Sequence, residues 1–171
     1  MVSATDRPFQ NRGSWQEPRQ DTAMIISVGV NIKKILEKGR DYAWQKPEIC
    51  PACRFSRLWG HGFVAAYFDG VATCLMLRRY RCPACHCVIR MKPQGYFPRF
   101  QVSIETIRAS VFQRLTTGKY LARMLRSRQQ HWFRALKRNV LAYLGDPWRY
   151  CPATGFDRLI EIGIVPVSRS I

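Results

Sequence analysis

The chain has 171 residues with 28 basic and 11 acidic side chains, which gives a net charge of +17 at neutral pH. This length allows one or two small domains and excludes a large enzyme, and an apolar content of 47% excludes wholesale disorder. No apolar run is long enough to span a bilayer, and the N-terminus lacks the basic-then-apolar layout of a signal peptide. We therefore expect a cytoplasmic protein, in which cysteine pairs bind metal rather than form disulfides.

The positive charge is concentrated in one part of the chain. Residues 50–145 hold 17 basic and two acidic side chains, and arginine accounts for most of the basic residues. The planar guanidinium of arginine suits phosphates and guanine edges. We expect a nucleic-acid partner, double-stranded DNA above all, and a nucleoid-associated location. A membrane surface is a weaker candidate, because no basic segment is accompanied by an anchor.

Residues 1–39 predict an irregular leader followed by one strand and one short helix. Residues 1–22 are polar, mixed in charge and interrupted by proline, which indicates a disordered leader. The apolar run from Met24 to Val30 predicts one short strand. Asn31 is suited to cap a brief helix that ends at Lys38, with Gly39 just beyond its C-terminus.

Two Cys-Pro-Ala-Cys pairs predict a metal site. Cys50 and Cys53 form one pair, Cys82 and Cys85 form the other, and 28 residues separate them. Four thiolates in this pattern suit one tetrahedral structural zinc ion, although the iron of a rubredoxin-like site uses the same spacing. The residue after each pair, often glycine in such turns, is Arg54 or His86. His86 and Cys87 are alternative ligands, whereas Cys74 and Cys151 are expected to be packing residues.

The segment between the cysteine pairs predicts a β-hairpin. Residues 62–68 and 71–80 are rich in aromatic and β-branched side chains, and Asp69-Gly70 between them suits a two-residue type I′ turn. A hairpin between two such pairs is the layout of a zinc ribbon, which we assign to residues 23–100 together with the preceding strand and helix.

After residue 100 the apolar period changes from two to 3.6, which predicts helices. Ser103 is a natural N-cap for a first helix that ends near Gly118, and a short second helix is expected over residues 120–125. Ser127 and Gln130 form a capping box for a third helix that ends at Leu144. Residues 101–146 are therefore predicted to form a helix-turn-helix-like bundle, with residues 147–171 as an extended tail.

The third helix and the segment before it carry the candidate DNA-binding residues. Residues 106–145 contain no acidic side chain, and one face of the third helix is basic while the opposite face is apolar. The candidates are Arg114, Lys119, Arg123, Arg126, Arg128, His131, Arg134, Lys137 and Arg138. Taken together, the patterns predict an α+β protein, an N-terminal zinc ribbon followed by a three-helix bundle.

Several short motifs resemble one family. They are Cys50-Pro51-x-Cys53, Leu58-Trp59-Gly60-His61-Gly62, Tyr67-Phe68-Asp69-Gly70, the run from Arg78 to Cys85, and Pro93 with Pro98-Arg99. Together they resemble small bacterial zinc-ribbon proteins associated with insertion sequences and transposases. The resemblance covers residues 24–145 and implies a DNA-binding protein that is accessory or regulatory to transposition. A transposase or a second copy of the chain is the partner that it implies.

Two alternatives stay open. One is an RNA-binding or protein-interaction module, in which the ribbon docks on a larger assembly. The other is a compact transposase or nuclease. Metal-dependent strand transfer needs several carboxylates, and only Asp69 and Glu105 lie between Cys50 and Leu144. We therefore do not expect an enzyme.

Overall fold

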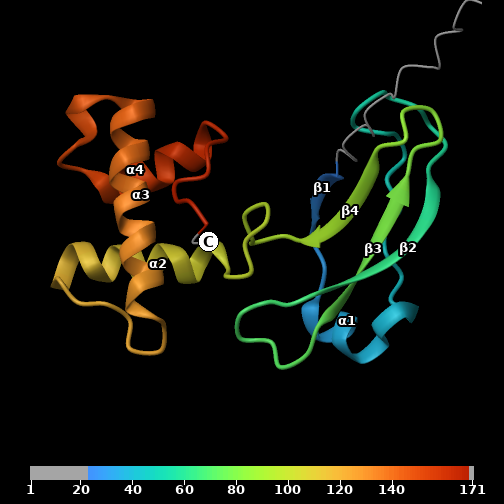
Figure 1. The fold of residues 1–171 in the computed structure, drawn as a ribbon, viewed down its shortest axis with the longest axis horizontal. Helices are drawn as coiled ribbons and strands as arrows, with labels where there is room; N and C mark the ends of the chain where they lie inside the picture. Colours follow the sequence, from blue (N-terminus) through green and yellow to red (C-terminus); the bar gives the residue numbers. More distant parts are fainter. Residues whose placement is uncertain (1–22, 170–171) are drawn as a thin grey trace, which may run out of the picture.

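The computed structural model describes residues 23–169, in which a four-stranded sheet and a group of helices lie side by side (Figure 1). The predicted leader, residues 1–22, lies outside the described residues. We call residues 23–93 the sheet lobe, residues 94–103 the linker and residues 104–167 the helical lobe. Each lobe has its own cluster of buried apolar side chains. The α+β class predicted from the sequence is confirmed.

The sheet has the order β1-β4-β3-β2. Its strands are β1 (Ala23–Val28), β2 (Trp59–Ala66), β3 (Leu75–Arg81) and β4 (Val88–Pro93). β1 pairs with β4 in parallel, and the other two pairings are antiparallel. Helix α1 (Ile32–Lys38) and the short 3-10 helix η1 (Gly39–Asp41) follow β1. The predicted cap is confirmed, because the side chain of Asn31 accepts a hydrogen bond from the Lys34 amide.

The predicted hairpin forms, but its two-residue turn is wrong. β2 pairs with β3 up to Ala66 and Leu75, so eight residues rather than two connect the strands. Phe68 is buried and meets Tyr96 edge to face at 4.6 Å, and the Asp69 amide donates to the carbonyl of Gln101 at 2.9 Å. These contacts hold the connection against the linker. Asp69 and Gly70 still form a turn, closed by the Val71 amide donating to the Phe68 carbonyl at 3.1 Å, but only Gly70 of the two has a positive φ, so the turn is not of type I′.

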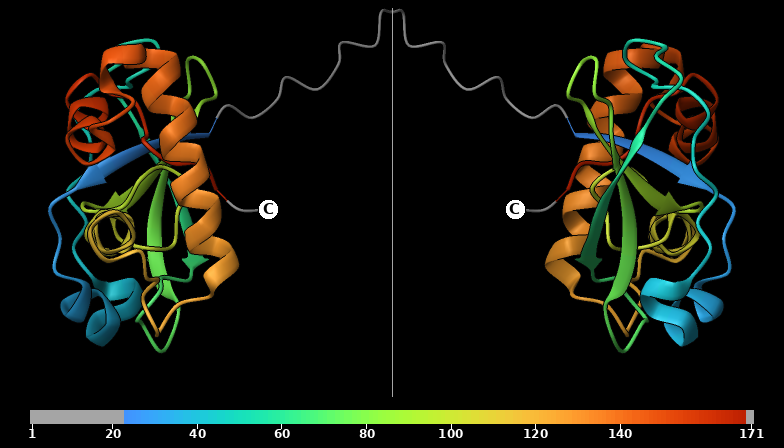
Figure 2. Two further views of the ribbon diagram at one scale, coloured as in Figure 1. Left: turned by 90° about the vertical axis from the view of Figure 1, so that its left-hand side faces the viewer. Right: turned by 90° about the vertical axis from the view of Figure 1, so that its right-hand side faces the viewer.

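The helical lobe consists of α2 (Ile104–Thr117), α3 (Arg126–Leu144), the 3-10 helix η2 (Asp146–Trp148) and α4 (Pro152–Glu161). α3 crosses α2 steeply, as the views along the molecule show (Figure 2). The predicted N-cap of α2 is confirmed, because the Ser103 side chain accepts from the Thr106 amide, and the helix ends at Gly118 as expected, where the backbone is left-handed with φ 72°.

Two predictions for this lobe are wrong. The expected second helix is absent, and residues 118–125 form a loop instead. α3 begins at Arg126, before Ser127, and no side chain caps it. The expected helix-turn-helix arrangement is therefore not confirmed.

The C-terminal segment is also not the extended tail that its apolar run predicted. α4 begins at Pro152. The N–H groups of the first helical turn have no acceptor within the helix, so the N–H that proline lacks costs no hydrogen bond there. Phe156 and Leu159 of α4 are fully buried in the helical core. Gly155 lies so close to α3 that an added Cβ would be 2.8 Å from a methyl carbon of Val140. The prediction of an extended tail is therefore wrong for residues 152–161, whereas residues 162–169, which follow α4, contain no helix or strand.

Candidate metal centre and basic surfaces

The two cysteine pairs occupy backbone turns of the same design. The first turn precedes β2, and the second joins β3 to β4. In the first, the Arg54 amide donates to the Cys50 carbonyl at 2.8 Å and the Cys50 amide donates to the Phe55 carbonyl at 2.8 Å. In the second, the His86 amide donates to the Cys82 carbonyl and the Cys82 amide to the Cys87 carbonyl, each at 3.0 Å. Each turn presents two sulfur atoms toward the other turn.

The four sulfur atoms form one cluster that can hold a metal ion. All lie within 4.8 Å of one another, with Cys53 at 3.5 Å from Cys82 and Cys50 at 3.6 Å from Cys85. A tetrahedral zinc ion with four bonds of about 2.3 Å would place its sulfur ligands about 3.8 Å apart. The donor set and the spacing therefore fit tetrahedral thiolate coordination. Cys50 and Cys82 are fully buried, whereas Cys53 is exposed.

The sulfur atoms influence one another's ionisation. For Cys82, burial opposes ionisation, but hydrogen bonds from the Cys85 amide and from the Cys53 thiol outweigh it and lower the pKa to about 7. For Cys53, a hydrogen bond from the Phe55 backbone favours the thiolate, yet partial desolvation of its sulfur within the cluster and the neighbouring sulfurs raise the pKa to about 12. A metal ion must displace such protons, so its binding is favoured as pH rises.

The residues that replace the usual glycines adopt the backbone conformation of glycine. Arg54 has φ 65° and His86 has φ 60°, both in the left-handed region. A side chain in this region costs about 1–2 kcal/mol through contact between Cβ and the carbonyl oxygen. The two turns therefore store strain next to the cysteine cluster.

Substitution of His86 by Gly is expected to stabilise the protein by about 0.5–1 kcal/mol, because strain relief exceeds the greater chain entropy of unfolded glycine. The midpoint of thermal unfolding should rise by about 1–4 °C. Ala84→Gly is the matched control, because exposed Ala84 lies in the same turn without a positive φ. Ala84→Gly should lower the midpoint of thermal unfolding. An equal decrease of the midpoint in both variants would contradict backbone strain at His86.

The other three cysteines, Cys74, Cys87 and Cys151, lie outside the cluster. Cys87 is buried beside it, and its carbonyl rather than its sulfur completes the second turn. Cys74 lies in the β2–β3 connection and Cys151 precedes α4. His61 is half-buried at an irregularity of β2, and the neighbouring Trp59 is exposed.

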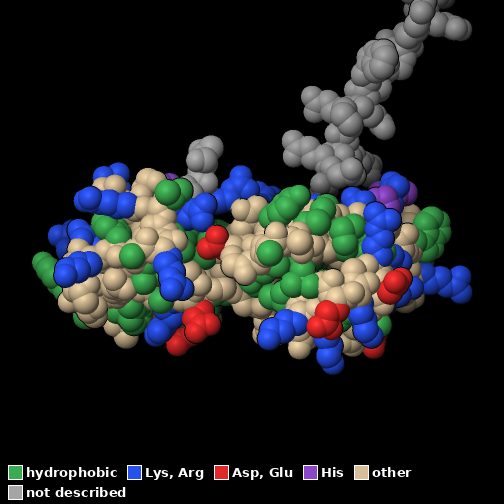
Figure 3. All heavy atoms as spheres, turned by 90° about the horizontal axis from the view of Figure 1, so that it is seen from below, with side chains coloured by type: hydrophobic (Ala, Val, Ile, Leu, Met, Phe, Trp, Pro, Cys, Tyr) green, Lys and Arg blue, Asp and Glu red, His purple; other side chains and the backbone are tan. Residues whose placement is uncertain are grey.

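The structure places the nine basic candidates on three segments of the helical lobe. Arg114 belongs to α2, Lys119 and Arg123 to the 118–125 loop, and Arg126, Arg128, His131, Arg134, Lys137 and Arg138 to α3. The ring of Tyr120 lies between two of them, 4.6 Å from the guanidinium of Arg114 and 5.5 Å from that of Arg126. Lys and Arg side chains occur on both lobes, whereas most acidic side chains visible in Figure 3 lie in its lower half.

These candidates differ in their accessibility. Arg134, Lys137 and Arg138 are exposed. His131 is half-buried, and its Nε2 lies 2.9 Å from the hydroxyl of Ser168 near the C-terminus. Among the described residues, the three ion pairs are Arg108–Asp157, Arg149–Asp146 and Arg158–Glu161, and none includes a candidate. The exposed basic side chains of α3 are thus not neutralised by an acidic partner in the part of the chain that the structure describes.

Several basic residues that sequence reasoning did not select meet between the lobes. Arg90, Lys92, Arg99 and Arg169 line one pocket there. Arg90 and Lys92 lie two positions apart on β4 and so share a face, but no local pattern joins them to Arg99 of the linker or to Arg169 near the C-terminus.

None of the helices within residues 23–169 has both the length and the apolar character that crossing a membrane requires. Comparison of the chain with protein-family models, curated proteins and solved structures finds no match in any of the three.

Proposed function

We propose that this chain is a DNA-binding protein whose sheet lobe is a zinc ribbon, stabilised by one structural zinc ion on Cys50, Cys53, Cys82 and Cys85. Four protein thiolates occupy all four coordination positions of a tetrahedral zinc ion, which leaves no open position for a substrate. The metal therefore stabilises the fold. Iron in the same site is distinguished from zinc by metal analysis and by its visible absorption.

The observation that carries the DNA-binding proposal is the unpaired basic surface of α3. Arg134, Lys137 and Arg138 are exposed within residues 106–145, which contain no acidic residue. Unneutralised charge on a rigid helix attracts phosphates over a distance of about 8–10 Å at physiological salt. Because the expected helix-turn-helix is not confirmed, we propose phosphate contacts by α3 without assigning base recognition to its N-terminus.

The resemblance to insertion-sequence proteins extends this proposal to a context. We propose a role accessory or regulatory to transposition in a bacterial cytoplasm, with the ends of a mobile element as the first duplexes to test. A transposase or a second copy of the chain is the proposed protein partner. We assign no catalytic step to this chain, because strand transfer with magnesium needs more carboxylates than Asp69 and Glu105 provide.

Replacement of Arg134 and Arg138 by Ala together is expected to weaken duplex DNA binding. Each lost phosphate contact should reduce the slope of log affinity against log salt by about 0.9. Fluorescence anisotropy of a labelled duplex, titrated from low to physiological salt, measures both effects.

The matched control replaces Arg149 and Arg158 by Ala. These arginines are exposed on the same lobe, are paired with Asp146 and Glu161, and their loss changes the net charge equally. The control should bind nearly as tightly as the parent protein. Equal weakening in both variants would mean that net charge, and not contact with α3, attracts the DNA.

A further inference from the structure

Two adjoining pockets lie where the sheet lobe meets the helical lobe. Their volumes are about 290 and 320 Å³. They share four lining residues, namely Arg99, Phe100, Gln101 and Arg169. We call the two together the inter-lobe groove. One end is formed by β4 and the β2–β3 connection, and the other by Arg128 and Trp132 of α3.

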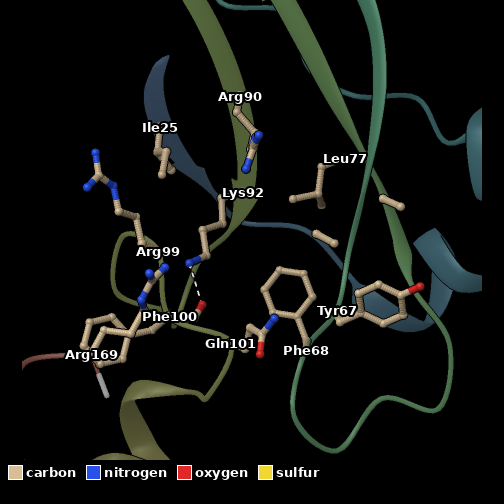
Figure 4. Close-up of a pocket in the computed structure, with 12 residues that line it drawn as sticks. Ile25, Tyr67, Phe68, Leu77, Arg90, Lys92, Arg99, Phe100, Gln101 and Arg169 are labelled. Atoms are coloured by element: carbon tan, nitrogen blue, oxygen red, sulfur yellow. Dashed lines mark hydrogen bonds between the residues drawn. The ribbon is translucent and has the colours of Figure 1, made fainter. Parts of the chain in front are cut away.

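The groove collects positive charge from separate parts of the fold. Its lining includes five basic residues and, among the described residues, no acidic one: Arg90, Lys92, Arg99, Arg128 and Arg169. Figure 4 shows Arg90, Lys92, Arg99 and Arg169 on one side of the first pocket and Tyr67 with Phe68 on the other. Burial, together with the charge of Arg90, lowers the pKa of Lys92 to about 8. Such convergence of like charges is unfavourable unless an anion occupies the space between them.

A further arginine, from β3, lies on the same face of the sheet as Arg90. Arg79 lies directly opposite Arg90 in the antiparallel pair of β3 and β4, so both side chains are on one face. Like charges at such positions destabilise a sheet. The Nε of Arg79 is also buried, with no hydrogen-bond partner among the described residues. An anion bound along this face would offset the repulsion between Arg79 and Arg90.

The backbone of the groove is held in a fixed conformation. The ammonium of Lys92 donates to the carbonyls of Phe97 and Phe100, at 2.5 and 2.8 Å, and so attaches the linker to β4. Arg99 lies between these two residues with φ 63°, a left-handed conformation that is costly for arginine. Strained backbone of this kind is concentrated at ligand sites, where the surrounding structure enforces it.

The shape and the lining select the class of anion. Pockets of this size enclose a phosphate with one or two nucleosides and cannot enclose a duplex. Tyr67, at the rim of the first pocket, is 65% exposed and can stack on a base. A basic channel with an exposed aromatic ring is the combination by which proteins bind single strands without reading their sequence.

We propose that the inter-lobe groove binds the backbone of a single nucleic-acid strand, with phosphates on Arg90, Arg99 and Arg169 and a base stacked on Tyr67. This inference rests on the proposed DNA-binding function and adds a second site to it. Arg128 of α3 lines the groove and belongs to the same helix as the proposed duplex surface. The preferred ligand is therefore a duplex that continues into a single strand.

The test compares two double variants, each of which removes two arginines. Arg99→Ala with Arg169→Ala alters exposed side chains of the groove, and Arg134→Ala with Arg138→Ala alters the outer surface of α3. Affinities are measured by anisotropy for a single-stranded oligonucleotide, a blunt duplex and a duplex with a single-stranded overhang. The groove variant should lose at least about tenfold in single-strand affinity and less than about twofold in duplex affinity. The α3 variant should show the reverse.

Tyr67→Ala separates stacking from charge. It leaves the net charge unchanged and should weaken single-strand binding by about fivefold or more, since one stacked base contributes about 1–3 kcal/mol. Circular dichroism and thermal unfolding confirm that each variant is folded.

The outcomes distinguish the two proposals. If the parent protein binds duplex but the groove variant keeps its single-strand affinity, the groove proposal is overturned and the duplex proposal stands. If the α3 variant keeps its duplex affinity while the groove variant loses the single strand, the duplex surface is wrong and the groove stands. Parallel losses for all probes in both variants, or no binding by the parent protein, would overturn the groove.

Discussion

Replacement of Cys50 by Ser is expected to abolish stoichiometric zinc binding and to unfold the sheet lobe. Cys50 is fully buried, and its sulfur lies 3.6 Å from that of Cys85 in the opposite turn. Structural zinc contributes about 10–16 kcal/mol in small zinc-dependent domains, which equals or exceeds the whole stability of a typical protein of about 5–15 kcal/mol. Loss of one thiolate, and of the metal with it, therefore removes a stabilisation as large as the whole free energy of unfolding.

The arrangement of the sheet explains this dependence. The long segment between η1 and β2, which carries the first cysteine pair, contains no strand or helix. The metal would bind this segment to the turn between β3 and β4, in addition to the packing of Trp44 and Leu58 in the core of the sheet lobe. Without that connection the segment should separate from β3. Leu58, which is buried beside the cluster, would then lose its packing.

Metal analysis and circular dichroism measure the expected effect. The parent protein should contain one equivalent of zinc, and strong chelators should unfold its sheet lobe reversibly. Cys151→Ser is the matched control, since this cysteine is exposed and lies outside the cluster. It should keep the metal and the unfolding midpoint. A Cys50→Ser protein with one equivalent of zinc and a native spectrum would refute the proposed role of the metal.

The metal cluster could be predicted from the sequence because its geometry is encoded locally. Two cysteines three positions apart in a turn present both sulfurs on one side, whatever the rest of the chain does. The departure from glycine at Arg54 and His86 was also visible in the sequence, and both residues adopt the left-handed conformation that glycine would supply. Only the cost of that conformation had to come from the structure.

The remainder of the sheet depends on contacts between distant residues. The alternation in Ile89-Arg90-Met91-Lys92 is a strand signal, but the parallel partner β1 lies more than 60 positions earlier. Likewise, Asp69-Gly70 forms a turn, closed by the Val71 amide donating to the Phe68 carbonyl at 3.1 Å, but the contacts of Phe68 and Asp69 with the linker place it within a longer connection. The groove arginines come from different elements, so no periodicity could indicate that they meet.

The helical lobe shows how one side chain can decide a local structure. Gln129 is buried, and its amide oxygen accepts hydrogen bonds from the Ser110 hydroxyl and the Leu121 amide, both at 2.8 Å. Its amide nitrogen donates to the carbonyls of Leu121 and Met124 at 2.8 and 2.9 Å. Backbone groups of the 118–125 loop thus find partners without forming a helix. The sequence indicated a capping box at Ser127 and Gln130, but the adjacent glutamine organises the turn.

Replacement of Gln129 by Leu is expected to destabilise the protein by about 3 kcal/mol and to lower the midpoint of thermal unfolding by about 6–12 °C. Leucine fills a similar volume, so the lost stability measures the four hydrogen bonds and not a cavity. It also includes the cost of leaving their buried partners without a hydrogen bond, among them the hydroxyl of Ser110, a residue that is 1% exposed. Gln113→Leu is the matched control: Gln113 makes one bond of 3.3 Å to the same loop, at Tyr120, and should cost less than about 1 kcal/mol. Because the loop carries Lys119 and Arg123, Gln129→Leu should also weaken duplex binding below its unfolding temperature. Equal midpoints of thermal unfolding for Gln129→Leu and Gln113→Leu would contradict this prediction. They would show that water replaces the hydrogen bonds of Gln129 and that α2 and α3 hold the loop in place without this side chain.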